Sequence, residues 1–323
     1  MSNQLLEFDE KYKSQNINYL AGVDEAGRGP LAGPVVAAAV VIDKENDLIN
    51  DSKKISEKKR DKAYKWIIDN AEYWAVASVG VKKIDEINIL QASLLAMEKA
   101  VGKLQIVPKK CLIDGNFIPK NIPNSEAIIK GDSRSYCIAA ASIIAKVTRD
   151  NIMRKWHKIY KDYHFDQHKG YGTKLHFEAI EEYFPSPIHR LGFAPIKDFQ
   201  FPRYPNRIKL GKWGENWAIY YLIHKGYKYI QRNYFAGKFG EIEIIMKKGK
   251  RYIFVEVKTK GPNDYYDVIE SIPRPKISKM LKCSDHYFYY KKIEEFEVGF
   301  DAIIVDAKNW RKPKIEHFED INY

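Results

Sequence analysis

Apolar runs and helical periodicity alternate along the first 160 residues in the order that an α/β protein requires. Five apolar runs predict strands, at residues 19–23, 34–42, 73–81, 110–113 and 127–130. Between and after them, the spacing of apolar positions predicts helices from Ser56 to about residue 70, over 85–103, and from Ser133 onward. The last of these, SRSYCIAAASIIAKVTRDNIMRKW, carries small and apolar residues on one stripe, as a helix packed on a sheet should.

A second α/β pattern begins after residue 205. The stretch FPRYPNRIKLGKWGENW has the prolines and basic residues of a linker that enters a new helix, so we place a boundary near Pro205. Beyond it the pattern predicts a helix over 212–225, a strand over 229–234 and a β-hairpin around Lys248-Gly249. The sequence therefore predicts two domains, 1–205 and 206–323, the second smaller than the first.

Charge points to the kind of partner. The formal net charge is +12, and residues 206–323 contain 23 basic and 16 acidic residues, so this part carries +7 and the preceding part +5. Because basic residues are spread over the whole chain, nucleic acid is a better match than a membrane surface. The first residues lack the apolar stretch of a signal peptide, and the longest apolar run is too short to span a bilayer. We expect a cytoplasmic protein with no membrane partner, and three widely spaced cysteines that are structural thiols.

Four acidic residues follow predicted strands. Asp24 and Glu25 end the first, Asp114 ends the fourth, and Asp132 follows the fifth. If these strand ends converge, the carboxylates need a counter-charge, and oxygen ligands favour Mg²⁺ or Mn²⁺. Each acid also has a local alternative: Asp132 could cap the long helix, Asp114-Gly115 could form only a turn, and Asp24 and Glu25 should point to opposite faces of a regular strand.

The predicted hairpin of the second domain carries charges in a comparable pattern. Glu241 and Glu243 share one strand face, and Glu256 and Lys258 share another. Carboxylates from neighbouring strands can hold a cation while a lysine near a scissile phosphate orients water or stabilises developing charge. The alternative is an exposed hairpin face with compatible cross-strand charges.

Seven motifs occur in the order found in bacterial ribonuclease HII, which the first 200 residues resemble: GVDEAGRG at 22–29, DSKKIS from Asp51, LIDGN from Leu112, KGDS from Lys130, IAAASIIAKVTRD from Ile138, HKGYGT from His168 and SPIHR from Ser186. The resemblance implies a ribonuclease H-like mixed sheet with helices. It also implies hydrolysis of the RNA strand of RNA–DNA hybrids, and cleavage 5′ of single ribonucleotides embedded in duplex DNA. Its catalytic, metal-binding acids correspond to Asp24, Glu25, Asp114 and Asp132.

The same resemblance implies which residues bind substrate. Gly27, Arg28 and Gly29 would grip the ribonucleotide at its 2′-hydroxyl, and Tyr171 would stack on the sugar beside the cleaved junction. A partly buried loop aromatic is the alternative for Tyr171. We expect phosphate contacts from four basic residues, although isolated lysines are usually just solvated: Lys53, Lys54, Lys146 and Arg190.

The second domain resembles the YraN family, uncharacterised bacterial proteins with a restriction-endonuclease-like fold. The motifs are Gly214-Glu215, NYFAGKFGEIEII, FVEVKTK, Lys276 and GFDAIIVD, and the family usually has Asp where this chain has Glu243. The resemblance implies a nuclease-like site at Glu215, Glu243, Glu256 and Lys258, and a module that binds, and in one version cuts, branched or nicked DNA. The alternative is a non-catalytic DNA-binding or protein-interaction scaffold in repair.

Overall fold

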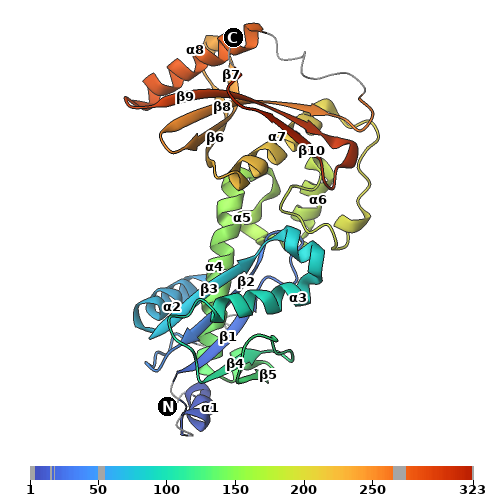
Figure 1. Cartoon of the computed structure of the whole chain (residues 1–323). Helices are drawn as coiled ribbons and strands as arrows, with labels where there is room; N and C mark the ends of the chain where they lie inside the picture. Colours follow the sequence, from blue (N-terminus) through green and yellow to red (C-terminus); the bar gives the residue numbers. More distant parts are fainter. Residues whose placement is uncertain (1–3, 15–16, 18, 50–54, 265–273, 322–323) are drawn as a thin grey trace. The chain divides into compact units, whose positions relative to one another are not determined.

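The computed structural model describes residues 4–14, 17, 19–49, 55–264 and 274–321 (Figure 1). The chain divides into two compact units, Met1–His176 with Ile188–Lys197, and Phe177–Pro187 with Asp198–Tyr323. Residues 177–187 and 198–205, which the predicted boundary assigns to the first domain, belong to the second compact unit. The division at residue 205 stays a prediction about which segments fold independently.

The first unit contains a five-stranded mixed sheet with the strand order β3-β2-β1-β4-β5. Its strands are β1 (Leu20–Ala26), β2 (Val35–Val41), β3 (Tyr73–Val79), β4 (Lys110–Asp114) and β5 (Ser125–Ile128). β1, β2 and β3 pair antiparallel, whereas β4 runs parallel to β1 and β5 parallel to β4. All five predicted strands exist, and β5 begins two residues earlier than predicted. The α/β fold class is confirmed.

Helices occupy the three remaining predicted segments of this unit, and the first and the last two of the helices named below were not predicted. They are α1 (Gln4–Lys13), α2 (Glu57–Asn70), α3 (Val81–Val101), α4 (Tyr136–Ile159), α5 (Phe165–His168) and α6 (Lys174–Tyr183), the last of which continues into the second unit. The long helix begins at Tyr136 and not at Ser133, because the Ser135 side chain accepts a hydrogen bond from the Ile138 N–H at 3.3 Å and caps it. Asp132 lies earlier, in the 3₁₀ turn Gly131–Ser133, so the helix-cap alternative for this residue is wrong.

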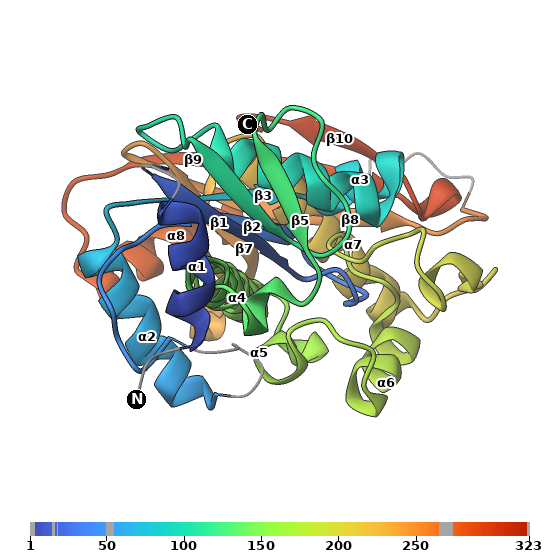
Figure 2. The ribbon, with the colours of Figure 1, turned by 90° about the horizontal axis from the view of Figure 1, so that it is seen from below.

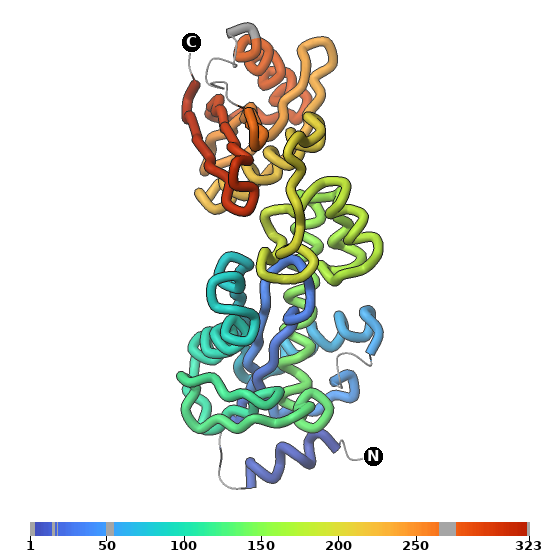
Figure 3. The backbone as a smooth tube through the Cα atoms, turned by 90° about the vertical axis from the view of Figure 1, so that its right-hand side faces the viewer, coloured from blue at the N-terminus to red at the C-terminus, as the bar shows by residue number. Residues whose placement is uncertain are grey.

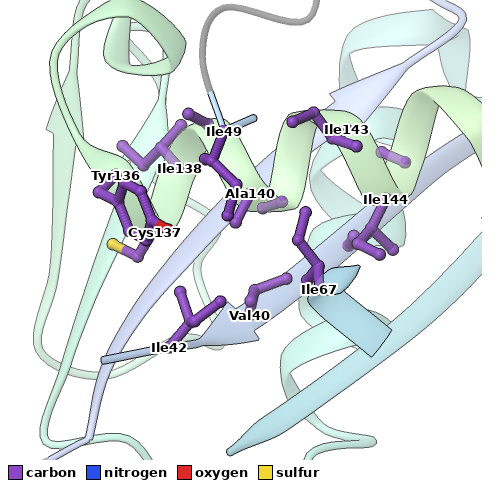
Figure 4. Close-up of a cluster of buried hydrophobic side chains, with 14 of the residues drawn as sticks. Val40, Ile42, Ile49, Ile67, Tyr136, Cys137, Ile138, Ala140, Ile143 and Ile144 are labelled. Atoms are coloured by element: carbon purple, nitrogen blue, oxygen red, sulfur yellow. The ribbon is translucent and has the colours of Figure 1, made fainter. Parts of the chain in front are cut away.

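Helices cover both faces of the sheet. Every residue of β2, VVAAAVV, is buried, which explains its uninterrupted apolar run. Ala38 and Val40 belong to a core with α1, α2 and α4, and the odd-numbered residues of the strand belong to a core with α3. Figure 2 shows α4 nearly end-on beneath the sheet, and Figure 4 shows Val40 of β2 beside Ile67 of α2 and Ile144 of α4.

α4 lies unusually close to β1, and one glycine permits it. A Cβ atom on Gly22 would lie 2.1 Å from the backbone carbonyl carbon of Cys137 and 2.2 Å from the backbone nitrogen of Ile138. Side chains cannot yield at this contact, because both partners are backbone atoms. The strand that ends in Asp24 and Glu25 is therefore held directly against the first turn of the helix.

The described residues of the second unit include a sheet with the order β10-β9-β8-β7-β6 and two helices besides the end of α6. Figure 3 traces the strands of this sheet in orange to red. The elements are α7 (Arg207–His224), β6 (Lys228–Phe235), β7 (Glu241–Lys248), β8 (Arg251–Lys260), α8 (Arg274–Lys291), β9 (Glu297–Asp306) and β10 (Lys314–Phe318). The predicted hairpin is β7 and β8, which pair antiparallel up to Lys248 and Arg251. α7 begins five residues before the predicted helix, since Asn206 caps it by accepting from the N–H groups of Ile208 and Lys209.

All three cysteines are buried and unbridged, in agreement with structural thiols. Within the described residues, no helix has the length and apolar character needed to cross a membrane.

Gly22→Ala should destabilise the first unit strongly, because the new methyl group would push α4 away from β1. We expect a loss of about 2–4 kcal/mol, at or above the usual cost of overpacking, measured as a lower urea midpoint. Gly80→Ala is the matched control: φ at Gly80 is −75° and a Cβ there meets nothing within 4 Å. An alanine at residue 22 that is tolerated as well as one at residue 80 would contradict the packing described above.

Candidate functional site

β1 is a regular strand at Asp24 and Glu25, so the two side chains point to opposite faces of the sheet. The sequence analysis gave this arrangement as the alternative for adjacent acids on one strand. Asp24 pairs in register with Ala38 and Glu25 with Ala37. Asp24 is on the α4 face, where it is 4% exposed and hydrogen-bonded by the Ser142 side chain. Glu25 is on the α3 face, in a small pocket that it lines together with Asp114 and residues of α3.

Asp114 and Asp132 come from neighbouring strand ends, and one hydrogen bond joins these ends. The Gly131 N–H donates to Asp114 Oδ1 at 2.6 Å. Asp132, the next residue, is 5% exposed. Gly115 has a φ of +101°, so Asp114-Gly115 does form a turn, and this local role coexists with a position at the site.

Electrostatics couple three of the four acids. Burial, followed by the charges of Glu25 and Asp114, raises the pKa of Asp24 well above its usual range. Burial also raises the pKa of Glu25, where the nearby Arg28 opposes the shift and Asp114 adds to it. Among the residues that the structure describes, no group of three or more His, Cys, Asp or Glu side chains is arranged so that it could hold a metal ion. The structure thus brings Asp24, Glu25 and Asp114 into one electrostatic cluster and places Asp132 on the adjoining turn.

The glycine loop after β1 lies beside Tyr171. Arg28 and Gly29 are exposed, and Arg28 Nη1 lies 3.3 Å from Glu25 Oε1. A Cβ on Gly29 would be 3.7 Å from Cε1 of Tyr171, which is 42% exposed. Tyr171 is therefore a surface ring next to the loop, and not the partly buried aromatic of the alternative interpretation.

The prediction that Arg190 contacts phosphate is wrong, because its side chain is not accessible from the surface. Its side chain is fully buried, and its guanidinium donates to the carbonyls of Gly27, Arg28 and Gly33 at 2.5, 2.8 and 3.0 Å. Its donors are directed at the loop backbone, so we replace the predicted phosphate contact with a role in holding the loop. The sequence alone could not reveal this, because the carbonyls are more than 150 residues away.

Arg149 is a site residue that the sequence analysis missed. It is fully buried and donates to the carbonyls of Ala32, Pro34 and Lys169 at 3.0, 3.1 and 3.0 Å. An arginine at the end of a stripe of small and apolar residues was the available signal.

The other predicted phosphate contacts are lysines. Lys146 is partly exposed, donates to Asp150 at 2.8 Å and has its Nζ 5.8 Å from the centre of the Tyr171 ring. Lys53 and Lys54 lie outside the described residues.

In the second unit, the four predicted site residues lie in one charged cluster. Glu256, 1% exposed, accepts from Lys258 Nζ at 2.8 Å. Burial and the charge of Glu256 raise the pKa of Glu243 to about 7, and Glu215 adds to this shift. Glu243 also accepts from the Val257 N–H at 2.6 Å. Glu256 is buried and the other three residues are half-buried, so the predicted site is not a fully exposed hairpin face.

Two further cations belong to this cluster. Lys276 Nζ lies 3.0 Å from the second carboxylate oxygen of Glu256, and Arg232 forms an ion pair with Glu215. Each of these contacts joins residues far apart in the chain. For Lys276, its place in the YraN-like motif order was the only signal, and Arg232 had none.

Two protein families match this chain in succession. The sequence model of the ribonuclease HII family matches residues 21–196, and that of an uncharacterised protein family, UPF0102, matches residues 214–305. Since the first match covers more than half of the chain, this protein belongs to the ribonuclease HII family and is an endoribonuclease of the ribonuclease H type 2 class.

Individual relatives agree with the family match. The chain is 53% identical over 180 residues to ribonuclease HII of Idiomarina loihiensis, covering 55% of this chain and 96% of that protein. It is 49% identical over 201 residues to ribonuclease HII of Endomicrobium trichonymphae, covering 61% of this chain and 96% of the relative. Among solved structures, ribonuclease H2 of Pyrococcus horikoshii matches with a TM-score of 0.49 and 32% identity, over 56% of this chain and 96% of that one.

Glu243→Gln should remove a pH dependence of stability in the second unit. Because the folded-state pKa of Glu243 is about 7 and its ordinary value is 4.5, the folded state binds more protons than the unfolded state between these values. Stability should therefore fall as pH rises from about 4.5 to 7, by on the order of 1–3 kcal/mol, and level off above pH 7.

Amide exchange of β7 and β8 in the full chain, followed from pH 5 to 8 without divalent cations, measures this slope. Glu241→Gln, at the exposed start of the same strand, is the control and should keep the wild-type slope. If Glu243→Gln keeps it too, the fall has another origin.

Proposed function

We propose that the first unit hydrolyses the RNA strand of RNA–DNA hybrids and cuts on the 5′ side of single ribonucleotides embedded in duplex DNA, with Mg²⁺ or Mn²⁺ as cofactor. The observation that carries the proposal is the cluster of buried and half-buried carboxyl groups at adjoining strand ends, within a chain of the ribonuclease HII family. Asp24, Glu25, Asp114 and Asp132 are the proposed catalytic and metal-binding residues.

The donor set suits a hard divalent cation. It consists of carboxylate oxygens, without thiol or imidazole groups, and such oxygens favour Mg²⁺ or Mn²⁺ over zinc. Asp24 and Asp114 disfavour each other's ionised form, and a bound dication relieves this repulsion. Two cations at such a site supply stabilisation of the entering and leaving oxygens of phosphodiester hydrolysis.

The residues around the acids select and orient the substrate in this proposal. Gly27, Arg28 and Gly29 form the loop that approaches the ribonucleotide, whose 2′-hydroxyl distinguishes it from DNA. Tyr171, exposed beside Gly29, offers a ring face for stacking on the neighbouring sugar. Lys146 sits next to that ring and can contact phosphate, and we keep Lys53 and Lys54 as phosphate contacts on the family resemblance alone.

For the second unit we propose binding of branched or nicked DNA through phosphate contacts. The +7 charge of residues 206–323 supports the binding, and the cluster of Glu215, Glu243, Glu256 and Lys258 supports a version in which the unit also cuts. The second candidate is a non-catalytic scaffold. The ion pairs that Glu256 forms with Lys258 and Lys276 favour it, because a carboxylate that is already neutralised attracts a metal ion less strongly.

Asp24→Asn should reduce cleavage of a duplex with one ribonucleotide by at least about 100-fold, the usual scale for losing a major electrostatic element of a site. The isosteric amide keeps the packing but removes a charge that a cation needs. Asp9→Asn is the matched control, since Asp9 is equally buried but binds the Cys137 N–H at 2.9 Å and not the site.

A second readout does not depend on catalysis. Mg²⁺ or Mn²⁺ should raise the melting temperature of the wild-type chain and of Asp9→Asn, but not of Asp24→Asn, because a ligand that binds only the folded state stabilises it. Equal activity and equal metal-induced stabilisation in both variants would rule out Asp24 as a metal ligand.

Binding of nicked, all-deoxyribonucleotide DNA by the full chain should weaken steeply as salt rises, because each neutralised phosphate releases condensed counterions. Lys258→Gln should lower the slope of log affinity against log salt by about 1, whereas Lys314→Gln, an exposed lysine on β10 paired with Glu316, should not. Binding that Lys258→Gln leaves unchanged would favour the scaffold alternative. In the cutting version, Glu256→Gln also abolishes a metal-dependent nick.

A further inference from the structure

Two fully buried arginines, Arg149 and Arg190, hold the glycine loop of the first unit. Together they donate to six backbone carbonyls, five on the loop that joins β1 to β2 and one at Lys169. A buried guanidinium is costly unless its N–H groups are satisfied, and burial lowers the pKa of Arg190 to about 9. Backbone carbonyls that need only a hydrogen-bond donor can be paired in a sheet. The use of two buried cations as donors here therefore needs an explanation.

The orientation of the peptide groups supplies one. In a trans peptide the C=O and N–H point in opposite directions. Arg190 binds the carbonyls of Gly27 and Arg28 from inside, so the N–H groups in the same two peptides, those of Arg28 and Gly29, point outward. Both residues are exposed, and two adjacent outward N–H groups form a site for an oxygen atom.

The other three loop carbonyls that the arginines bind, those of Ala32, Gly33 and Pro34, lie at the base of the loop. Their peptide groups are not part of the outward-facing pair of N–H groups. Gly33 donates its N–H to Ile188 at 2.8 Å, and Leu31 donates to Gly170 at 2.8 Å. Gly27 itself requires a residue without a side chain, since φ is +100° and a Cβ would lie 2.1 Å from Nε of Arg149. The loop therefore has one conformation that both arginines enforce.

Arg149 extends the same clamp to the segment with Tyr171. Its bond to the Lys169 carbonyl joins this segment to the loop, and its guanidinium carbon lies 5.9 Å from the centre of the Tyr171 ring. A buried histidine completes the support, since His176 Nδ1 lies 2.9 Å from the Tyr171 carbonyl oxygen and donates to it. The outward N–H groups and the ring are thus held together by one set of buried contacts.

We propose that Arg149 and Arg190 are positioning residues that orient the Arg28 and Gly29 N–H groups toward the ribose 2′-hydroxyl and align them with Tyr171. They touch backbone and not substrate, so they act on recognition and not on the hydrolytic step. This inference rests on the proposed substrate, a ribonucleotide within a duplex.

Arg190→Lys and Arg149→Lys test the proposal in the full chain. A lysine keeps the charge, but its single ammonium cannot reach three carbonyls in the fork geometry of a guanidinium. We expect KM for a single-ribonucleotide duplex to rise about 3- to 10-fold, the factor that one hydrogen bond is worth, while kcat changes by less than about 3-fold. The control is Arg154→Lys, which should leave KM unchanged, because Arg154 is a partly exposed arginine on the helix of Arg149 and pairs with Glu57.

A measurement on the wild-type protein keeps the proposal testable if the lysine variants do not fold. The backbone amide signals of Arg28 and Gly29 should shift when a single-ribonucleotide duplex is added in EDTA, and shift less with the all-DNA duplex of the same sequence. An unchanged KM in folded lysine variants, or amide signals that respond equally to both duplexes, would overturn the inference. A wild-type chain that fails to cut the ribonucleotide duplex would instead refute the proposed function.

Discussion

The backbone contact between Gly22 and the first turn of α4 is the constraint on which the first unit depends. It places α4 and β1 closer together than any side chain at residue 22 would allow. This distance determines which residues the later turns of α4 contact. Ser142 reaches Asp24, Arg149 reaches the loop at Gly27, and Met153 lies against Gly33. These positions are 7 and 4 residues apart and so lie on one face of the helix. One helix face thus contacts both Asp24 and the glycine loop after β1.

Buried charge is handled in opposite ways around this helix. Burial, and with it the charge of Asp114, raises the pKa of both Asp24 and Glu25, and a divalent cation bound there, as proposed, would offset this unfavourable environment. The arginines a few residues away are instead satisfied by carbonyl oxygens. Carboxyl groups whose ionised forms are disfavoured suit a site proposed to bind a cation, whereas a satisfied cation suits a scaffold that must not move.

In the second unit, by contrast, the buried and half-buried carboxylates are paired with basic side chains. Glu256 has two ammonium partners and Glu215 a guanidinium partner, so much of its negative charge is compensated within the protein. Glu243 is the exception, with a pKa raised to about 7. A metal ion that binds this cluster must displace the basic partners of Glu256 and Glu215 or share the carboxylates with them. The version of the module that cuts DNA requires this step, whereas the version that only binds DNA does not.

The sequence by itself determined the order of strands and helices, because burial on one or two faces imposes a period that is visible residue by residue. It also placed the four acids at strand ends and on the turn after one, since strand ends and turn residues are local features. Its errors about helix ends were local as well: the start of α3, the start of α4, where Ser135 proved the better cap, and the start of α7. Only the tertiary structure decided the roles of Arg149, Arg190 and Lys276. Their partners are backbone carbonyls or a carboxylate brought close by folding, and a contact between distant segments leaves no period in the chain.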